Sequence, residues 1–341
     1  MAAAAATVLA GAVGCGCSPG NSSGASSSGS SSSSSNSTGT LSGSVSMDGS
    51  STVSPIMEAV AEEFGKENSG VKPTVATSGT GGGFKKFSAG EIDIANASRP
   101  IKQEEIDAAK ANGVDFVELP IAYDGLTVVV NPANSFAGTL TVAELKKIWE
   151  PNSPVKTWAD VRAGFPAEQI KLYGAGTDSG TFDYFTKEIV GKEKSSRSDY
   201  QASEDDNVLV QGVSGDRFSL GYFGYSYYKE NTDKLKAVAI DNGTGAVAPS
   251  PETIIGGTYL PLSRPLFLYV NKKALDEKPA VAGIIEYLLT SSGRALITEV
   301  GYVPLPDNVY ELVLERLRSK KTGSVFSDAS TGVKIEDILK K

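Results

Sequence analysis

The sequence predicts an α/β fold in which sheets are covered by helices. Short runs rich in Val, Ile, Leu and aromatic residues alternate along the chain with amphipathic helical patterns. All 32 Lys and Arg and all 40 Asp and Glu lie beyond residue 47, and the chain is 40% apolar and 21% charged. This composition is typical of a soluble globular protein that is large enough to bury a core.

The composition also excludes several classes of function. The chain contains no His, which excludes Ser-His-Asp and Cys-His nucleophile systems and any zinc site that uses His. Its net charge is −8 and it has no clustered Lys/Arg tract, so neither a nucleic acid nor an anionic membrane surface is expected as a partner. We expect no metal site and no cofactor.

The first 17 residues predict a signal or lipoprotein leader. A short apolar run ends in small residues before Cys15, as at a lipoprotein processing site where Cys15 is the lipidated residue. A positively charged start is missing and Ala12 stands where Leu is usual, so a disordered leader is the alternative. The run is too short to span a membrane.

Residues 18–44 predict a flexible tether between this leader and the folded body. Fifteen Ser and five Gly fill these 27 positions, which leaves almost nothing apolar to bury. Such a segment has a root-mean-square reach of about 30 Å. A tether of this kind suits a protein held at the periplasmic or outer side of a membrane by a lipid anchor.

The elements of the body follow from residue type and periodicity. Runs of β-branched, apolar and aromatic residues predict strands at 71–77, 92–97, 114–119, 126–131, 170–174, 236–240 and 266–271. Apolar residues at helical spacing predict a first helix through Val53, Met57, Val60 and Phe64, and further helices at 102–111, 141–149, 181–190, 280–290 and 307–319. No repeat at a solenoid period is present.

The first predicted helix follows a turn of three hydroxyl residues, Ser50, Ser51 and Thr52, and has Pro55 near its start. An ordinary helix cap is the alternative interpretation. One side-chain oxygen suffices for a cap, so the surplus hydroxyls and exposed N–H groups can donate to an anion.

A glycine-rich stretch follows Ser78, with four Gly at positions 79–83. It lets the backbone approach a ligand closely, and the alternative is a flexible turn. It is not a P-loop, because Lys85 is followed by Lys86 rather than by Ser or Thr.

Two further segments place polar side chains beside apolar strands. Ser98 and Arg99 end a buried-looking strand, where α/β sheets bind ligands, although a surface salt bridge is the alternative. Asp124 interrupts an apolar stretch, with the strand resuming at Leu126, and is either an ordinary turn residue or a hydrogen-bond acceptor in a donor-rich site.

A second hydroxyl-rich helix start occurs in the other half of the chain, at Ser179, Gly180 and Thr181. Together with the turn at 50–52 and the pair Ser98-Arg99, it predicts a cradle for an oxyanion at a domain boundary.

These motifs resemble those of one family. The segments DGSSTV, SGTGGGF, ASRPI, YDG, YGAGTDSGTFDYFT, DDNVLVQGVSGD and YLPLSRPLFLYV occur in the order found in the phosphate-binding component of bacterial ABC phosphate importers, the PstS family. The similarity covers 41–341. It implies a two-lobed type II periplasmic binding protein fold, each lobe a central sheet flanked by helices, with the ligand in the cleft between the lobes.

The resemblance also implies boundaries, partners and site residues. Lobe I would comprise 45–128 and 256–341, and lobe II 129–255. The protein would be a monomer that captures inorganic phosphate and delivers it to the permease of the importer. The implied phosphate ligands are Ser50, Ser51, Thr52, Ser78, Ser98, Arg99, Asp124, Ser179, Gly180 and Thr181. Many relatives have Arg where this chain has Ala175, so Arg99 is expected to be the sole guanidinium on the ligand.

Two other functions stay open. One is an extracytoplasmic hydrolase with Ser50 or Ser179 as nucleophile, although no Ser-x-x-Lys stands at either turn. The other is a binder of sulfate or molybdate. Asp124 would discriminate here, because a carboxylate accepts a hydrogen bond from protonated phosphate and repels fully ionised sulfate.

Overall fold

The structure, a computed structural model, describes residues 41–340 except 178, 204 and 328–333. The predicted leader with Cys15 and most of the tether lie outside the described residues. The first strand, β1 (Ser42–Gly49), begins within the last three residues of the predicted tether. Thr40–Lys341 is one compact unit, and the boundaries of the two lobes stay a prediction.

Ten strands of the described chain form one mixed sheet, and three more form a small separate sheet. The main path, in spatial order, is β2 (Gly70–Ala76), β1, β3 (Ile94–Ala97), β12 (Ser263–Asn271), β4 (Phe116–Val130), β8 (Ser219–Gly224), β6 (Lys171–Ala175) and β7 (Gln201–Ser203). Two short strands, β9 (Lys236–Ala237) and β13 (Val303–Pro304), also pair with β4. The small sheet contains β11 (Ala246–Val247), β10 (Ala239–Asp241) and β5 (Thr139–Thr141).

The strand β4 joins the two parts of the main sheet. Its residues from Phe116 to Gly125 pair with β12, and those from Leu126 to Val130 pair with β8. All 15 of its residues are buried. The sequence predicted two strands here, separated at Asp124, and that prediction was wrong.

The strand is not interrupted at Asp124 and Gly125, because both residues fit the packed sheet. Asp124 lies opposite Arg264 in the antiparallel register, and its carboxylate accepts a hydrogen bond from that guanidinium. At Gly125 a Cβ atom would lie 2.6 Å from Cδ1 of Ile254, so a glycine is needed for this close approach.

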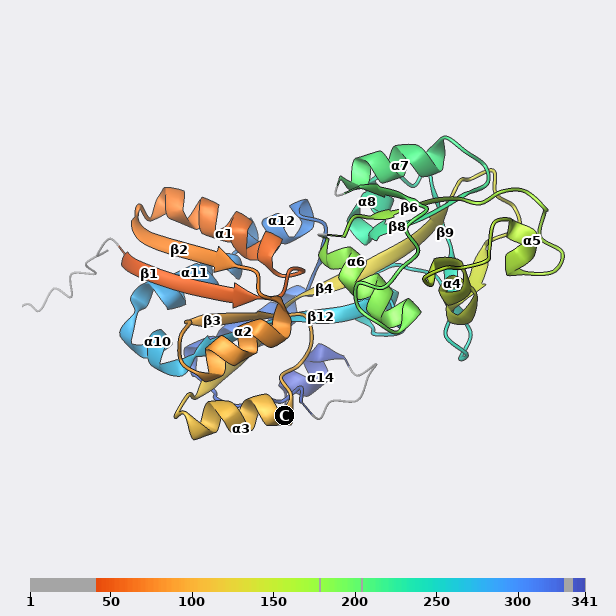
Figure 1. The fold of residues 1–341 in the computed structure, drawn as a ribbon. Coiled ribbons are helices and arrows are strands. Elements are labelled where there is room, and N and C mark those ends of the chain that lie inside the picture. Colours follow the sequence, from red (N-terminus) through yellow and green to blue (C-terminus); the bar gives the residue numbers. More distant parts are fainter. Residues whose placement is uncertain (1–40, 178, 204, 328–333, 341) are drawn as a thin grey trace, which may run out of the picture. The chain divides into compact units, whose positions relative to one another are not determined.

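Helices flank the main sheet, and Figure 1 shows α1 and α2 on opposite sides of β1. The helices are α1 (Ser54–Glu67), α2 (Gly79–Ser88), α3 (Gln103–Ala111), α4 (Val142–Trp149), α5 (Trp158–Val161), α6 (Gly180–Phe185), the π-helix η1 (Thr186–Val190), α7 (Asp206–Ser214), α8 (Tyr225–Glu230), α9 (Pro251–Ile255), α10 (Lys272–Glu277), α11 (Pro279–Leu288), α12 (Ser291–Glu299), α13 (Asp307–Arg318) and α14 (Ile335–Leu339). The single helix predicted at 181–190 is divided into α6 and η1. In the part of the chain that the structure describes, no single helix is long and apolar enough to cross a membrane. The helices α11 and α12 reach that length and apolar composition only when they are taken together, and the chain is bent by 66° between them.

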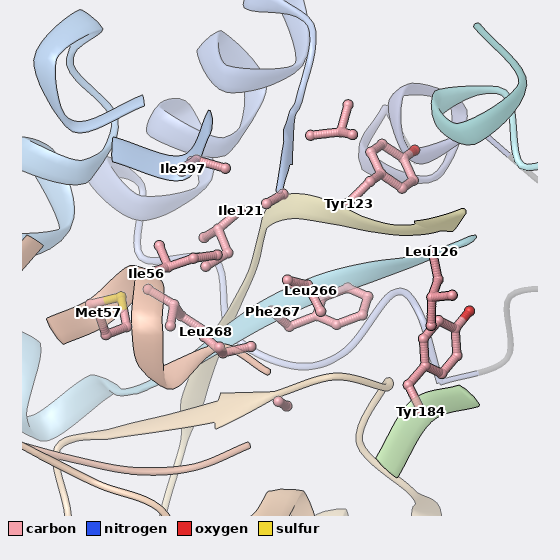
Figure 2. Close-up of a cluster of buried hydrophobic side chains, with 14 of the residues drawn as sticks. Ile56, Met57, Ile121, Tyr123, Leu126, Tyr184, Leu266, Phe267, Leu268 and Ile297 are labelled. Atoms are coloured by element: carbon pink, nitrogen blue, oxygen red, sulfur yellow. The ribbon is translucent and has the colours of Figure 1, made fainter. Parts of the chain in front are cut away.

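One buried apolar cluster extends through both parts of the sheet. Figure 2 shows side chains from α1, β4, β12, α12 and α6 within it. Leu266 and Phe267 of β12 are fully buried, and Figure 2 shows them in the same cluster as Leu126 and Ile121 of β4. Most of β4 and the stretch Leu266–Val270 of β12 belong to this cluster, which anchors both strands in the core.

Candidate functional site

A cavity of about 430 Å³ lies where the chain leaves β1, β2 and β3 and meets α6 and β12. The strands β2 and β3 are both parallel to β1, so all three end at the same edge of the sheet, where α/β folds bind ligands. Six of the ten predicted ligands line this cavity, namely Ser50, Ser51, Thr52, Ser78, Ser98 and Arg99. Three segments that the sequence analysis singled out, at 50–52, at Ser78 and at Ser98-Arg99, therefore lie on one cavity.

The hydroxyl-rich turn after β1 leads directly into α1. Val53, the residue before α1, has a helical conformation and no side-chain cap, and the carbonyl oxygen of Ser50 accepts from the Ser54 N–H at 3.0 Å. The Ser50 hydroxyl accepts a hydrogen bond from the backbone N–H of Thr52 at 3.2 Å, within the turn itself. Ser50 therefore makes the hydrogen bonds of an ordinary cap, and Ser51 and Thr52, which also line the cavity, are surplus to it.

The glycine-rich stretch forms the first turns of α2 rather than a flexible loop. A Cβ atom at Gly83 would lie 2.6 Å from the Cα atom of Gly49, so its absence allows α2 to pack directly on β1. This packing brings Thr80, a lining residue that the sequence analysis missed, to the end of β3. The hydroxyls of Thr80 and Ser98 are 3.2 Å apart, and Thr80 also accepts from the Ser98 N–H at 3.3 Å.

Arg99 enters the cavity wall with its charge already paired. Its two terminal nitrogens donate to the two carboxylate oxygens of Glu105, at 2.9 and 2.8 Å. The guanidinium carbon also lies 5.2 Å from the centre of the Phe84 ring. A bidentate pair of this kind fixes the orientation of the side chain.

Arg264 is a second guanidinium in the cavity wall, and the sequence analysis missed it. Its side chain is 15% exposed and donates to Thr52 Oγ1 at 3.0 Å and to Asp124 Oδ2 at 3.2 Å. The guanidinium carbon stacks 3.6 Å from the centre of the Tyr184 ring. A signal was available, because Ser263-Arg264-Pro265 repeats the tripeptide Ser98-Arg99-Pro100.

The register explains why the two Ser-Arg-Pro segments meet. The last residue of β3, Ala97, lies opposite Phe267 in the antiparallel β3–β12 pair. The chain beyond Ala97 therefore runs alongside the start of β12, and Arg99 and Arg264 reach the same cavity. We expected Arg99 to be the sole guanidinium at the site, but the cavity wall contains two, Arg99 and Arg264.

Asp124 is not among the residues that line the cavity. It is buried, and its carboxylate lies against Arg264. Burial raises the pKa of Asp124, and the charge of Arg264 and its hydrogen bond oppose that rise. In this arrangement Asp124 holds Arg264 in place rather than facing the cavity.

The second hydroxyl-rich turn, Ser179 to Thr181, approaches the first one without lining the cavity. The hydroxyl of Ser179 accepts from the Thr181 N–H at 3.1 Å and caps α6. A Cβ atom at Gly180 would lie 2.8 Å from the backbone N of Thr52 and 2.9 Å from its Cα. The start of α6 therefore packs directly on the turn after β1.

Four other charged residues line the cavity, namely Lys102, Lys187, Asp183 and Glu193. Burial raises the pKa of Asp183, and Lys194, whose Nζ is 3.6 Å from Asp183 Oδ2, opposes that rise only in part. Within the ranges that the structure describes, no group of three or more His, Cys, Asp or Glu is placed to hold a metal ion.

The buried carboxylate of Asp48 supports the cavity from behind. It accepts hydrogen bonds from the Ser78 N–H, at 2.9 Å, and from the Lys86 ammonium. Burial alone would raise the pKa of Asp48, but these hydrogen bonds outweigh it and hold the pKa below its usual value. Asp48 therefore links β1 to both ends of α2.

We expect Asp48→Asn to destabilise the fold in a pH-dependent way. A carboxyl group whose pKa is lowered by folding stabilises the folded state at pH values above its unfolded-state pKa of about 3.9. This stabilisation is lost as the pH falls through the folded-state pKa. In urea unfolding from pH 6 to pH 2, the difference in free energy of unfolding between wild type and variant should shrink towards low pH. Asp233→Asn, at an exposed position, is the control. A difference that stays constant over this range would contradict the prediction.

Comparisons with known proteins agree with this geometry. Residues 34–292 match the model of the PBP superfamily domain. The chain is 52% identical over 300 residues to Protein SphX of Synechococcus elongatus, covering 87% of this chain and 88% of the relative. It is 41% identical to the phosphate-binding protein PstS of Staphylococcus saprophyticus, covering 78% and 82%. A crystal structure of a possible phosphate-binding protein from Planctomyces limnophilus has 54% identity and a TM-score of 0.79, covering 82% of this chain and 99% of that one.

These matches confirm the fold class and the family that the sequence predicted. The α/β architecture, with a central sheet flanked by helices, is that of the type II periplasmic binding proteins. Members of this family are substrate-binding proteins rather than enzymes. The chain belongs to the PBP superfamily and, within it, to the PstS family of phosphate-binding proteins.

Proposed function

We propose that this protein captures inorganic phosphate in the 430 Å³ cavity and delivers it to an ABC importer. The main support is the convergence of Arg99 and Arg264 with the turn after β1, which together offer hydroxyl, backbone and guanidinium donors. Hydrogen bonds to a charged ligand contribute roughly 1.5–3 kcal/mol each, which outweighs the screened repulsion from the net charge of −8.

The proposed ligand contacts come from the residues that line the cavity. Ser50, Ser51, Thr52, Ser78 and Ser98 offer hydroxyl or backbone donors, and Thr80, Arg99 and Arg264 complete the set. Ser179, Gly180 and Thr181, which pack on the turn after β1, would add donors from the start of α6. Arg264 would supply the charge that many relatives obtain from an Arg at the position of Ala175.

The remaining parts of the proposal concern location and partners. Acylation of Cys15 would anchor a monomeric protein to the outer face of a membrane, and the segment from 18 to 44 would let the folded body move at that surface. The partner would be the permease of a phosphate importer. Size-exclusion chromatography with light scattering and mass spectrometry of the membrane fraction test the monomer and the anchor.

Selection against sulfate requires an acceptor at the ligand. Asp124 faces Arg264, whereas Asp183 lines the cavity, so we assign to Asp183 the role of accepting the proton of phosphate. Its raised pKa follows from burial, which also makes a second unprotonated anion beside it costly. Sites built to hydrogen-bond a ligand hydroxyl reject analogues that lack it by about 10⁴–10⁵.

Calorimetry with phosphate, arsenate, sulfate and molybdate tests both proposals. The wild type should bind phosphate and arsenate and show no heat with the other two anions. Asp183→Asn should retain phosphate binding and gain measurable sulfate binding, because an amide can donate where the carboxylate repels. Asp233→Asn is the matched control. Sulfate or molybdate binding by the wild type would overturn the phosphate assignment, and unchanged sulfate rejection by Asp183→Asn would remove Asp183 as the selecting residue.

A further inference from the structure

The antiparallel strands β4 and β12 carry two polar cross-strand pairs. Arg264 lies opposite Asp124 and binds it, as described above. Five residues further along β12, Tyr269 lies opposite Glu118, and its hydroxyl donates to Glu118 Oε1 at 2.7 Å. Both side chains of this second pair are fully buried, and neither lines the phosphate cavity. Burying polar groups is costly unless they are hydrogen-bonded, so the other partners of this pair indicate what it does.

The hydroxyl of Tyr269 reaches the loop that carries Arg99, which comprises residues 98–102 between β3 and α3. It accepts a hydrogen bond from the Ile101 N–H at 2.9 Å, two residues beyond Arg99. Arg99 donates from Nη1 to the carbonyl oxygen of Pro100 at 3.1 Å, so the guanidinium and the backbone of this loop are held together. Tyr269 therefore fixes the backbone to which the Arg99 side chain is bound.

The ring of Tyr269 supports the same guanidinium from a second direction. Its centre lies 4.8 Å from the centre of the Phe84 ring, in an edge-on arrangement. The Arg99 guanidinium carbon lies over the other ring, 5.2 Å from its centre. Phe84 belongs to α2 and is fully buried, so it has little room to move. Tyr269 thus contacts both the backbone beyond Arg99 and the ring beneath its guanidinium.

Glu118 determines which way the hydroxyl of Tyr269 points. An ionised carboxylate only accepts hydrogen bonds, so the single proton of the hydroxyl is directed at Glu118 and its lone pairs stay available for the Ile101 N–H. Burial raises the pKa of Tyr269 well above its ordinary value, and the charge of Glu118 adds to that rise, so the phenol keeps its proton. The carboxylate is itself held by three further donors, the Ser324 hydroxyl at 2.6 Å and the N–H groups of Val325 and Phe326 at 2.7 and 3.2 Å.

We propose that Tyr269 is a positioning residue for phosphate binding, which holds the Arg99 loop in its binding conformation through Ile101. The hydroxyl orders this loop before the ligand arrives, so the free energy of binding is not spent on ordering it. Tyr269 acts through Arg99 and does not itself contact phosphate. This inference rests on the proposed phosphate site, in which Arg99 is a donor.

The test is Tyr269→Phe, which removes only the hydroxyl, measured by calorimetry with inorganic phosphate. Without its acceptor the Ile101 N–H leaves the loop less ordered, and we expect binding to weaken about 3- to 10-fold, the share of one neutral hydrogen bond. Tyr310→Phe is the matched control, because the buried Tyr310 hydroxyl likewise accepts from a backbone N–H, that of Leu305 at 3.2 Å, and donates to the carbonyl oxygen of Ile121 at 2.9 Å. It should change the affinity less than twofold. Wild-type affinity in Tyr269→Phe, or equal losses in both variants, would overturn the inference.

A further variant distinguishes positioning from a general loss of stability. Tyr269→Phe also leaves the buried Glu118 carboxylate with one donor fewer. Adding Glu118→Gln removes that charge, and the amide oxygen can still accept from Val325 and Phe326. In urea the double variant should unfold closer to the wild type, while its phosphate affinity stays as low as that of Tyr269→Phe, because the Ile101 N–H still has no acceptor. Affinity that returns together with stability would mean that Tyr269 has only a structural role.

A double-mutant cycle with Arg99→Gln tests the route through Arg99. In that background Tyr269→Phe should change phosphate affinity less than twofold, because the guanidinium that it positions is gone and Ser98 is held separately by Thr80. Titration into the millimolar range keeps the weaker background measurable. The same loss in both backgrounds would overturn the inference. Failure of the wild type to bind inorganic phosphate would instead overturn the proposed function, which is a distinct result.

Discussion

Replacing Arg264 by Gln is expected to weaken phosphate binding by roughly 10- to 150-fold, since one charge-assisted hydrogen bond contributes about 1.5–3 kcal/mol. The effect has a second source. Asp124, whose side chain is 6% exposed, would lose its cationic partner and present an unpaired negative charge just behind the cavity. Breaking a buried ion pair from one side costs about 3–5 kcal/mol of stability. Calorimetry and urea unfolding measure the two effects separately.

A second variant separates binding from stability. In Arg264→Gln combined with Asp124→Asn, both charges of the buried pair are removed, so most of the stability should return. Phosphate affinity should remain low, because the donor facing the cavity is still absent. Arg318→Gln is the control, since that side chain is 66% exposed and pairs with Glu286 at the surface. If the double variant regains phosphate affinity together with stability, Arg264 has only a structural role.

The second large effect is expected at Gly180, where Ala should lower phosphate affinity by about 10- to 100-fold. The added Cβ would lie within 2.9 Å of two backbone atoms of Thr52, a separation that real Cβ atoms do not reach. Overpacking of this kind costs about 1–3 kcal/mol. The start of α6 and the turn after β1 would have to move apart, which changes the spacing of the donors between them.

Gly81→Ala is the matched control for this variant. Gly81 also lines the cavity, but a Cβ atom there would meet nothing within 4 Å. Its position inside α2 makes Ala favourable for the helix by up to about 1 kcal/mol. Wild-type affinity in Gly180→Ala would show that the contact with Thr52 is not needed for binding, and equal losses in both variants would point to a general effect of added volume.

The parts of the site that the sequence revealed are those encoded within single short segments. Ser50 to Thr52, Ser78 and Ser98-Arg99 each stand at a change from strand to helix or loop, so their place at the edge of a sheet follows from local pattern. The strands β2 and β3 were also predicted to within two residues at both ends, and the predicted apolar stripe from Val53 to Phe64 lies in α1 except for Val53, which directly precedes it.

The parts that the sequence did not reveal depend on neighbours distant in the chain. Asp124 and Arg264 form their ion pair only because β12 lies between β3 and β4 in the sheet. No local sequence pattern predicts that strand order. The same long-range pairing turned two expected strands into the single strand β4. The strand β8, SLGYFG, contains Gly221 and Gly224 and lacks the alternation that would have marked it, although five residues of β4 pair with it.

The central place of β4 also governs when the sheet can form during synthesis. Its partner Arg264 follows Asp124 by 140 residues. At about 5–20 residues per second, a ribosome needs roughly 7–30 s to add that length of chain. Throughout this interval β4, a mainly apolar strand that is buried along its whole length in the folded protein, has no native partner at its edge towards β12, and such edges pair readily with other chains. Assembly of the sheet is therefore a late event, and the nascent chain depends on protection of β4 until the residues up to Asn271 have been made.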